Sequence, residues 1–205
     1  MLSCRQTSIY DQLSGRYDRA HDRWLRHAGG EAQCAFEGAA TALLRPSMTV
    51  LDAACGTGTV ARRLLRAIDG RITLTLLDAS PKMLEHCADI EARRIRGLIQ
   101  NIPLPGDTFD LVTCAWGIET LPDPTPALAE FLRVCRPGGF VCLVFCADRP
   151  ARSITGEFLR HRIAGRGLGA FLCGASILRT ARTLGARNIR PLHCTGPAAA
   201  VLFQK

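Results

Sequence analysis

The stretch Val50-Leu-Asp-Ala-Ala-Cys-Gly-Thr-Gly58 decides the fold of this chain. It joins a short apolar run, Thr49–Ala53, to a segment with helically spaced apolar residues, Val60–Ile68. Glycines at a turn between a strand and a helix let the backbone approach a ligand closely, and the helix N-terminus favours negative charge. The stretch therefore predicts a ligand-binding loop at the carboxyl end of a buried strand.

Outside this stretch, short apolar runs alternate with longer segments of helical periodicity. We expect strands at Thr49–Ala53, Ile72–Asp78, Gly97–Ile99, Phe109–Ala115, Phe140–Ala147, Ile189–His193 and Ala198–Phe203. We expect helices at Val60–Ile68, after Ser80 and Pro81, at Pro126–Val134 and at Gly174–Leu184, with a turn at Arg136–Gly139. Apolar strands separated by helices predict a three-layer αβα sandwich of the α/β class, with a mostly parallel seven-stranded sheet.

Length and composition fit one globular domain. The chain has 205 residues, of which 47% are hydrophobic and 21% charged, which is enough for one core and is not typical of disorder. We divide it into an N-terminal helical lid at 1–45, a core at 46–147, and a cap with the last helix and strands at 148–205. No apolar run approaches the roughly 18 residues of a membrane span. The N-terminus has no signal-peptide pattern, so we expect a cytoplasmic protein.

Charge and cysteines exclude several classes of partner. The net charge is +8, yet the chain has no block of basic residues and no nucleic-acid-binding motif, so we expect no nucleic-acid partner. None of the 10 cysteines forms a CxxC pair. We therefore predict no metal site and interpret most cysteines as small buried hydrophobic residues.

A carboxylate, Asp78, ends the second predicted strand, twenty residues after Gly58. At this place it can accept hydrogen bonds from both hydroxyls of a ribose; the alternative is a helix-capping aspartate before Pro81. The loop lacks the third glycine of the dinucleotide fingerprint, which disfavours a nicotinamide enzyme. Asp52 would repel a pyrophosphate and suits a cationic amino-acid group.

Four segments in order carry a family resemblance: Val50–Gly58, the strand ending at Asp78, Ile102–Asp110 and Leu132–Gly139. Together they resemble the class I S-adenosylmethionine-dependent methyltransferases, which have a Rossmann-like fold with an N-terminal helical extension. The nearest subgroup is the ubiquinone/menaquinone C-methyltransferase-like enzymes (type 11 methyltransferase domain), with bacterial phospholipid N-methyltransferases nearby. The resemblance extends to Gly15–Asp22, which looks like the segment that lies over the cofactor.

The resemblance implies S-adenosylmethionine as cofactor and a set of residues that bind it. Tyr17 and the loop would hold the methionine end, Asp78 the ribose, and residues after the second and third strands the adenine. The residues implied are Tyr17, Asp52, Ala53, Gly56, Thr57, Gly58, Asp78, Ala79, Met83, Leu98, Ile99, Gln100 and Ala115, the last beneath the sulfonium. For Tyr17 the alternative is an aromatic anchor that packs a helix on the sheet.

Three residues depart from the family pattern. Ala54 replaces a usual glycine, which is tolerable if the backbone there is not left-handed. Leu98 replaces a frequent Asp or Asn that bonds the adenine amino group. Glu119 lies where the quinone enzymes carry an Arg-Asn pair, and this reversal of charge argues against a quinone precursor as the acceptor.

For the acceptor we expect a small-molecule or lipid-like compound. The segment Arg149–Arg166 carries five arginines against Glu157. This charge fits an anionic substrate or peripheral contact with an acidic membrane surface, and the alternative, which we favour, is a solvated face.

Other functions stay open beside that one. They are a phospholipid N-methyltransferase at a membrane surface, a catalytically silent S-adenosylmethionine-binding protein, and a metalloid methyltransferase that uses Cys114. His21, Asp22 and Glu119 are candidates for a general base. Each also has a surface or helix-capping alternative, so the sequence assigns no catalytic residue, and it does not fix an oligomeric state.

Overall fold

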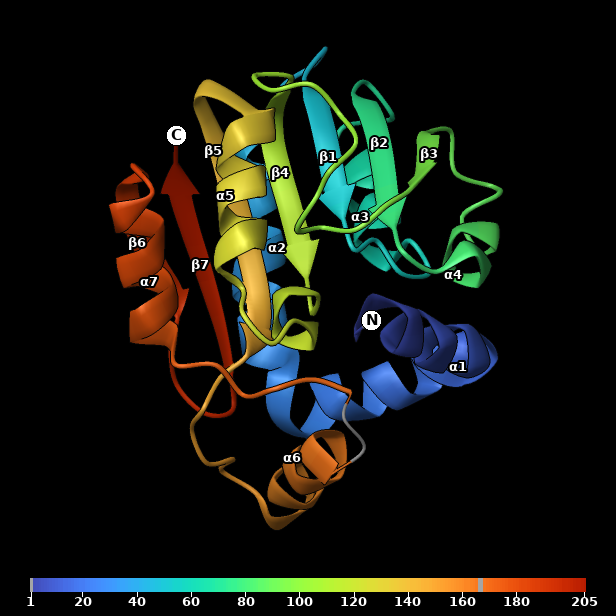
Figure 1. Cartoon of the computed structure of the whole chain (residues 1–205), viewed down its shortest axis with the longest axis vertical. Coiled ribbons are helices and arrows are strands. Elements are labelled where there is room, and N and C mark those ends of the chain that lie inside the picture. The colour runs from blue at the N-terminus through green and yellow to red at the C-terminus, as the bar shows by residue number, and fades with distance from the viewer. Residues whose placement is uncertain (1, 166–167) are drawn as a thin grey trace.

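The computed structural model describes residues 2–165 and 168–205, and it has the predicted three-layer α/β architecture (Figure 1). Its seven-stranded sheet has the order β3-β2-β1-β4-β5-β7-β6. Strands β1 to β5 are parallel, and β7 runs antiparallel to β5 and β6. The strands are β1 (Thr49–Ala53), β2 (Thr73–Asp78), β3 (Arg93–Arg96), β4 (Phe109–Ala115), β5 (Cys135–Cys146), β6 (Arg187–His193) and β7 (Ala198–Gln204).

Helices cover both faces of this sheet. Helices α5 and α7 lie on the face toward the viewer in Figure 1, and α2 lies behind it. Successive strand residues point to opposite faces, so Val50 packs in the core under α2 and α3 while Leu51 packs in the core under α5 and α7. The helices are α1 (Leu2–Trp24), α2 (Gly30–Leu43), α3 (Thr59–Ala67), α4 (Pro81–Glu85), α5 (Thr125–Val134), α6 (Ile154–Gly165) and α7 (Gly174–Thr183), with a π-helical turn η1 (Leu25–Gly29) and a 3-10 turn η2 (Ile118–Thr120).

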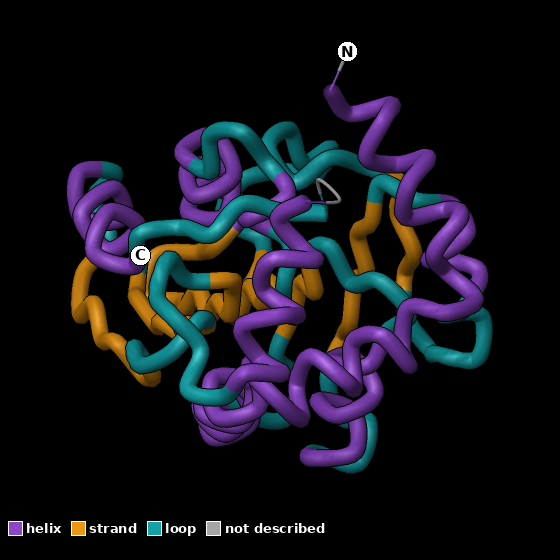
Figure 2. The backbone as a smooth tube through the Cα atoms, turned by 90° about the horizontal axis from the view of Figure 1, so that it is seen from below, coloured by secondary structure: helices purple, strands orange, loops and turns teal. Residues whose placement is uncertain are grey.

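Helix α1 lies across the carboxyl ends of β1, β2 and β4 rather than on a sheet face (Figure 1). Figure 2 views this end of the molecule, where helices and loops cross the strand ends. Two hydrogen bonds fix α1 there: Thr57 Oγ1 donates to Asp18 at 2.7 Å, and Ser80 Oγ donates to Asp11. Over the described residues, no helix is long and apolar enough to cross a membrane.

Two predicted elements differ from the structure. The third strand is Arg93–Arg96, which pairs with β2 from Thr75 to Asp78, and the predicted strand Gly97–Ile99 is a loop. The apolar pattern did not predict β3, because β3 is an edge strand whose exposed faces carry arginines. The predicted turn Arg136–Gly139 lies within β5, where Gly138 with φ 80° forms an irregularity that shifts the register with β4.

Asp110 holds the end of the sheet opposite α1. Through Asp110 and Arg136, the motifs Ile102–Asp110 and Leu132–Gly139 have a structural role. The Asp110 Oδ2 accepts hydrogen bonds from the Thr49 backbone N–H at 2.7 Å and the Thr49 hydroxyl at 3.0 Å. Its Oδ1 accepts from the Arg136 guanidinium at 2.7 Å. This one carboxylate therefore ties β1, β4 and the start of β5 together.

Replacing Asp110 by alanine should lower the free energy of unfolding by about 2 kcal/mol, because the half-buried Thr49 N–H loses its partner. Urea unfolding followed by circular dichroism measures this change. As a control, Asp22→Ala replaces an exposed carboxylate within α1 and should change stability by less than about 0.5 kcal/mol. Equal effects of the two substitutions would contradict the role of Asp110.

Candidate active site

The loop between β1 and α3 turns through three left-handed backbone positions. Ala54 has φ 55°, Gly56 φ 53° and Gly58 φ 81°. A Cβ on Gly58 would meet Ile90 Cδ1 at 2.5 Å, whereas a Cβ on Gly56 would meet nothing within 4 Å. Gly58 is therefore needed for packing and Gly56 faces open space. Alanine in place of the usual glycine would be unstrained only if the backbone were not left-handed. The backbone of Ala54 is left-handed, so this alanine is strained.

Asp78 lies opposite this loop at the end of β2. Its Oδ2 accepts the Gly56 backbone N–H at 2.8 Å, and its Oδ1 accepts the Ser80 N–H at 2.9 Å. Burial raises the pKa of Asp78 above its ordinary value, and these backbone donors oppose the shift. The helix-capping alternative belongs to Ser80 instead, whose hydroxyl accepts the Met83 N–H at 3.1 Å.

The loop and Asp78 border a cavity of about 710 Å³, which we call the loop cavity. The predicted residues that line it are Tyr17, Gly56, Asp78, Ala79, Met83, Leu98, Ile99, Gln100 and Ala115. Residues from α1, β2, the loop after β3 and the end of β4 thus meet at one place.

The other predicted residues lie behind the loop, and their contact with a cofactor stays a prediction. Asp52 is 1% exposed, accepts the Thr113 hydroxyl at 2.8 Å, and has its pKa raised to about 7 by burial. Ala53 is fully buried in β1. Thr57 bonds Asp18, and Gly58 packs against Ile90. These residues shape the loop from below.

A second cavity of about 720 Å³, which we call the aromatic cavity, adjoins the first. Tyr10, Tyr17 and Trp116 line both cavities. The chain has two tryptophans and two tyrosines, and all four side chains line the aromatic cavity. Tyr10, Tyr17 and Trp24 follow one another at intervals of seven along α1, so they share one face of that helix.

Trp116 is held in a strained conformation between the two cavities. It has φ 56°, which is unusual for a bulky residue and clusters at functional sites. Its backbone N–H donates to Val144 at 2.8 Å, and its indole N–H donates to Gln33 of α2 at 2.7 Å. Trp24 packs edge-on against its ring at 6.0 Å. A Cβ on Gly29 would meet both indoles, within 2.8 Å, so Gly29 keeps them in contact.

The three candidate bases have different places in the structure. Glu119 is 4% exposed in η2 and lines the aromatic cavity, so the surface alternative for it is wrong. Burial raises its pKa to about 7. His21 lines the same cavity, stacks on Tyr17 and has its pKa lowered to about 4 by burial. Asp22 is exposed and lines neither cavity.

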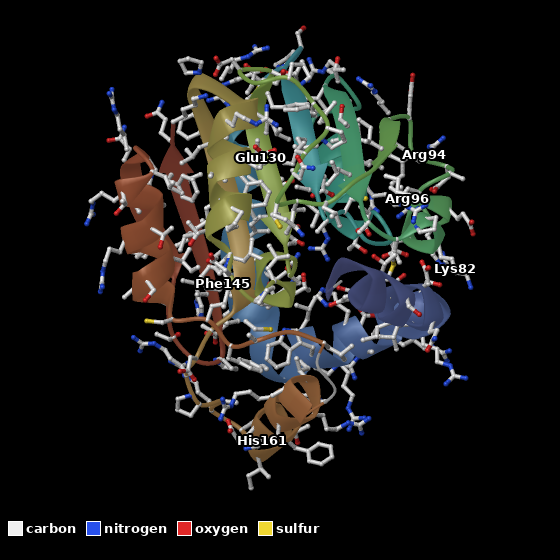
Figure 3. The ribbon with its side chains drawn as sticks, viewed as in Figure 1. Lys82, Arg94, Arg96, Glu130, Phe145 and His161 are labelled. Carbon is white, nitrogen blue, oxygen red and sulfur yellow. The ribbon has the colours of Figure 1, made fainter. Side chains whose placement is uncertain are left out.

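The arginines of the cap are partly paired. Arg160 contacts Glu157 at 2.8 Å, and Arg152 lies 3.8 Å from Glu31. His161, also on α6, lies on the side of that helix away from the sheet (Figure 3). Arg166 lies outside the described residues. Paired arginines fit a solvated face for much of the cap.

Cys114 is buried in β4 and lines neither cavity, and burial raises its thiol pKa well above the ordinary value. A protonated thiol is a poor metalloid ligand. Within residues 2–165 and 168–205, no group of three or more His, Cys, Asp and Glu side chains is placed to hold a metal ion.

Comparison with known proteins identifies the family. A methyltransferase domain model matches residues 51–143. The chain is 37% identical over 183 residues to the ubiquinone/menaquinone biosynthesis C-methyltransferase UbiE of Methylobacterium nodulans, covering 83% of this chain and 71% of that protein. The chain belongs to the class I S-adenosylmethionine-dependent methyltransferases. Proteins of the same description from Shewanella halifaxensis and Brucella abortus are spanned over only 47% and 54% of their lengths.

More distant comparisons agree on the fold of this methyltransferase. An S-adenosylmethionine-dependent methyltransferase from Aquifex aeolicus superposes with a TM-score of 0.64 at 16% identity, covering 84% of this chain and 92% of that one. A rice 2-methyl-6-phytyl-1,4-hydroquinone methyltransferase is 36% identical over 101 residues, which is 47% of this chain and 29% of the rice protein.

The loop cavity fits the cofactor of this methyltransferase family. The Asp78 carboxylate accepts the backbone N–H groups of Gly56, Ser80 and Ala79, which leaves it a lone pair that can accept a ribose hydroxyl. Gly56 leaves open space beside it. Tyr17 and Trp116 place aromatic rings at the wall, and aromatic faces attract cations such as a sulfonium. Leu98 and Ile99 give the cavity an apolar wall, which would suit an adenine ring.

The sequence did not point to several lining residues, chiefly Tyr10, Trp24 and Trp116. The spacing by seven of Tyr10, Tyr17 and Trp24 was a readable signal, because such residues share one face of a helix. Trp116 directly follows the strand that ends at Ala115, and ligands bind beyond the carboxyl ends of such strands. Both signals indicate a ligand site only if α1 covers the carboxyl end of the sheet, and the sequence does not show that placement.

Substituting Asp78 by alanine should weaken S-adenosylmethionine binding by on the order of 2–4 kcal/mol, because charge-assisted hydrogen bonds to the ribose are lost. Isothermal calorimetry measures the affinity. Asp89→Ala, which removes an exposed carboxylate paired with Arg62, is the control and should leave the affinity unchanged. Retained affinity in Asp78→Ala would contradict its place in the cofactor site.

Replacing Ala54 by glycine should raise the free energy of unfolding by about 0.5–1 kcal/mol, since relief of left-handed strain exceeds the added chain entropy. Ala53→Gly, one residue earlier in β1, should instead lower it, because a buried strand residue loses its side chain. Thermal unfolding of both variants gives the two signs. Destabilisation of both would rule out strain at Ala54.

Proposed function

We propose that this methyltransferase transfers a methyl group to a ring carbon of an aromatic, hydroxyl-bearing small molecule of the hydroquinone type, bound in the aromatic cavity. The observation that carries the proposal is the lining of that cavity. Both tryptophans and both tyrosines of the chain gather there. Flat aromatic walls favour a flat aromatic ligand, which stacks offset or edge-on against them.

The relation of the two cavities supports the same acceptor. They share Tyr10, Tyr17 and Trp116 as lining residues, so ligands in the two cavities would lie next to each other. Relatives that match the chain are named for methylation of ubiquinone, menaquinone and phytyl-hydroquinone precursors. We extend that acceptor class, though not any single compound, to this chain.

The protein has little chemistry to add to the transfer itself. When bound, S-adenosylmethionine supplies the methyl group on a sulfonium that needs no further activation. The side chains of the two cavities hold the two reactants in line and exclude water. Trp116 lines both cavities and is fixed by its hydrogen bonds to Val144 and Gln33.

Turnover with labelled S-adenosylmethionine tests the proposal. An alkyl-1,4-hydroquinone is the probe acceptor, and phosphatidylethanolamine vesicles are the comparison because phospholipid N-methyltransferases are a related group. Mass spectrometry of the product should show one added methyl on a ring carbon. Methylation of the vesicle lipid alone, or of neither acceptor, would overturn the proposal.

Filling each cavity separately should separate acceptor from cofactor. The half-buried Leu13 lines only the aromatic cavity of the two, and Ala79 only the loop cavity. Leu13→Trp should raise the hydroquinone KM by about tenfold or more with unchanged cofactor affinity, since overpacking costs roughly 1–3 kcal/mol. Ala79→Trp should weaken cofactor binding instead. Steady-state kinetics and calorimetry measure both, and an exchanged pattern would reverse the assignment of the cavities.

A further inference from the structure

We propose that Glu119 is a catalytic residue of this enzyme: its carboxylate binds a hydroxyl of the acceptor and takes the proton of that hydroxyl as the methyl group is transferred. The inference rests on the proposed function and deepens it by naming the group that activates the acceptor. The quinone enzymes of the family carry an Arg-Asn pair where this chain has Glu119. The proposed role is therefore specific to this chain.

The first observation is a carboxylate oxygen without a partner. Glu119 is 4% exposed and lines the aromatic cavity. Its Oε1 accepts the Cys146 backbone N–H at 3.2 Å, and the Cys146 thiol also interacts with the carboxyl group. Its Oε2 is buried and has no hydrogen-bond partner among the described residues. A buried carboxylate oxygen without a donor is costly, and an acceptor hydroxyl in the cavity would supply that donor.

The second observation is the position of Glu119 between the two cavities. It lies in η2, which begins three residues after the last residue of β4, and its neighbours Gly117, Thr120 and Leu121 line the loop cavity. The side chain of Glu119 itself lines the aromatic cavity. One short turn therefore carries a wall of the cofactor site and a carboxyl group in the acceptor site.

The surroundings hold the carboxyl group in place. The backbone N–H of Ala170 donates to the Glu119 carbonyl at 2.7 Å. A Cβ on Gly169 would lie 3.0 Å from Glu119 Cγ, so this segment already packs against the side chain. The segment covers Glu119 from outside, which keeps the side chain from turning to solvent.

Other titratable groups near Glu119 are less suited to take a proton at neutral pH. Tyr10 and Tyr17 of α1, Cys114 of β4 and Cys146 of β5 all have their pKa raised by burial, so they stay protonated. His21 of α1 has its pKa lowered to about 4 and is a weak base. None of the described cavity-lining residues is Arg or Lys. Burial without a neighbouring cation raises the pKa of Glu119 to about 7.

The hydroxyl proton passes to Glu119 while the ring carbon forms its bond to the methyl group and the bond from methyl to sulfur breaks. The ring then carries a keto group and an extra hydrogen at the methylated carbon. That hydrogen leaves as a proton to water, and the oxygen recovers its proton from Glu119. The net reaction releases one proton and returns the carboxylate.

A base must be deprotonated to act, which sets the expected pH dependence. Below pH 7 Glu119 is mostly protonated, so kcat should rise with pH through about 7 and level off above it. Glu119→Gln removes the titrating group with little change of shape. It should lower kcat at least about 100-fold, the usual range for a general base, and abolish the inflexion near pH 7.

The experiment compares wild type, Glu119→Gln, Glu119→Asp and the control Glu91→Gln, which replaces an exposed carboxylate, with an alkyl-1,4-hydroquinone as acceptor. Glu119→Asp keeps a carboxylate and should keep a pH inflexion at reduced rate. Calorimetry should show equal S-adenosylmethionine affinity in all four. Near-normal turnover with an unchanged pH profile in Glu119→Gln would overturn the inference and leave the proposed function standing.

A binding measurement separates the two proposals. Both tryptophans line the aromatic cavity, so intrinsic fluorescence reports its occupancy. The hydroquinone should bind wild type at least about tenfold more tightly than its dimethyl ether, and Glu119→Gln should lose this preference. If the preference is present but no methyl is transferred, the proposed function fails while the hydroxyl site at Glu119 stands. Equal binding of hydroquinone and ether to wild type would overturn the inference.

Discussion

The left-handed backbone of Trp116 is the constraint on which both cavities depend. The residues that directly follow the neighbouring strands β1 and β4 have nearly equal φ, 55° at Ala54 and 56° at Trp116. Such a conformation costs about 1–2 kcal/mol for a residue with a side chain. The two turns touch, since a Cβ on Gly117 would lie 2.6 Å from Ala54 Cβ. Hydrogen bonds from Trp116 to β5 and α2 hold the strain, and the chain thereby turns away from the sheet and leaves space for ligands.

Most of the fold follows from the sequence because a parallel sheet covered on both faces requires apolar strands. The runs at β1, β2, β4, β5 and β7 are buried along nearly their whole length, and the pattern predicted each of them. The prediction was wrong at β3, where an edge strand of arginines pairs through its backbone. An apolar pattern cannot reveal a strand whose side chains are largely exposed.

The candidate site likewise has one part that the sequence predicts and one part that it does not. Asp78 and Gly56 were predictable because their roles depend on local order, a strand followed by a turn, and they do border the loop cavity. The aromatic cavity was not, since it forms only where α1 crosses the strand ends and brings Tyr10 and Trp24 to Trp116. The positive φ of Ala54 was likewise hidden, because residue type alone does not fix the backbone angle. Tertiary placement decides these features.

The charge at Glu119 takes its meaning from the residues around it. From the sequence alone, Glu119 in place of the Arg-Asn pair of the quinone enzymes argued against a quinone-type acceptor. That argument assumes that an arginine and a glutamate at the same position recognise ligands of opposite charge. The carboxyl group is buried among aromatic rings and thiols, with no arginine or lysine among the described residues that line its cavity. A neighbouring cation would keep it ionised and lower its pKa, whereas burial alone raises the pKa to about 7. The same carboxyl group can then accept a proton from a neutral ligand and release it again, which a fixed charge cannot do. A reversal of charge therefore need not change the acceptor class; it changes how the protein can activate an acceptor that carries a hydroxyl.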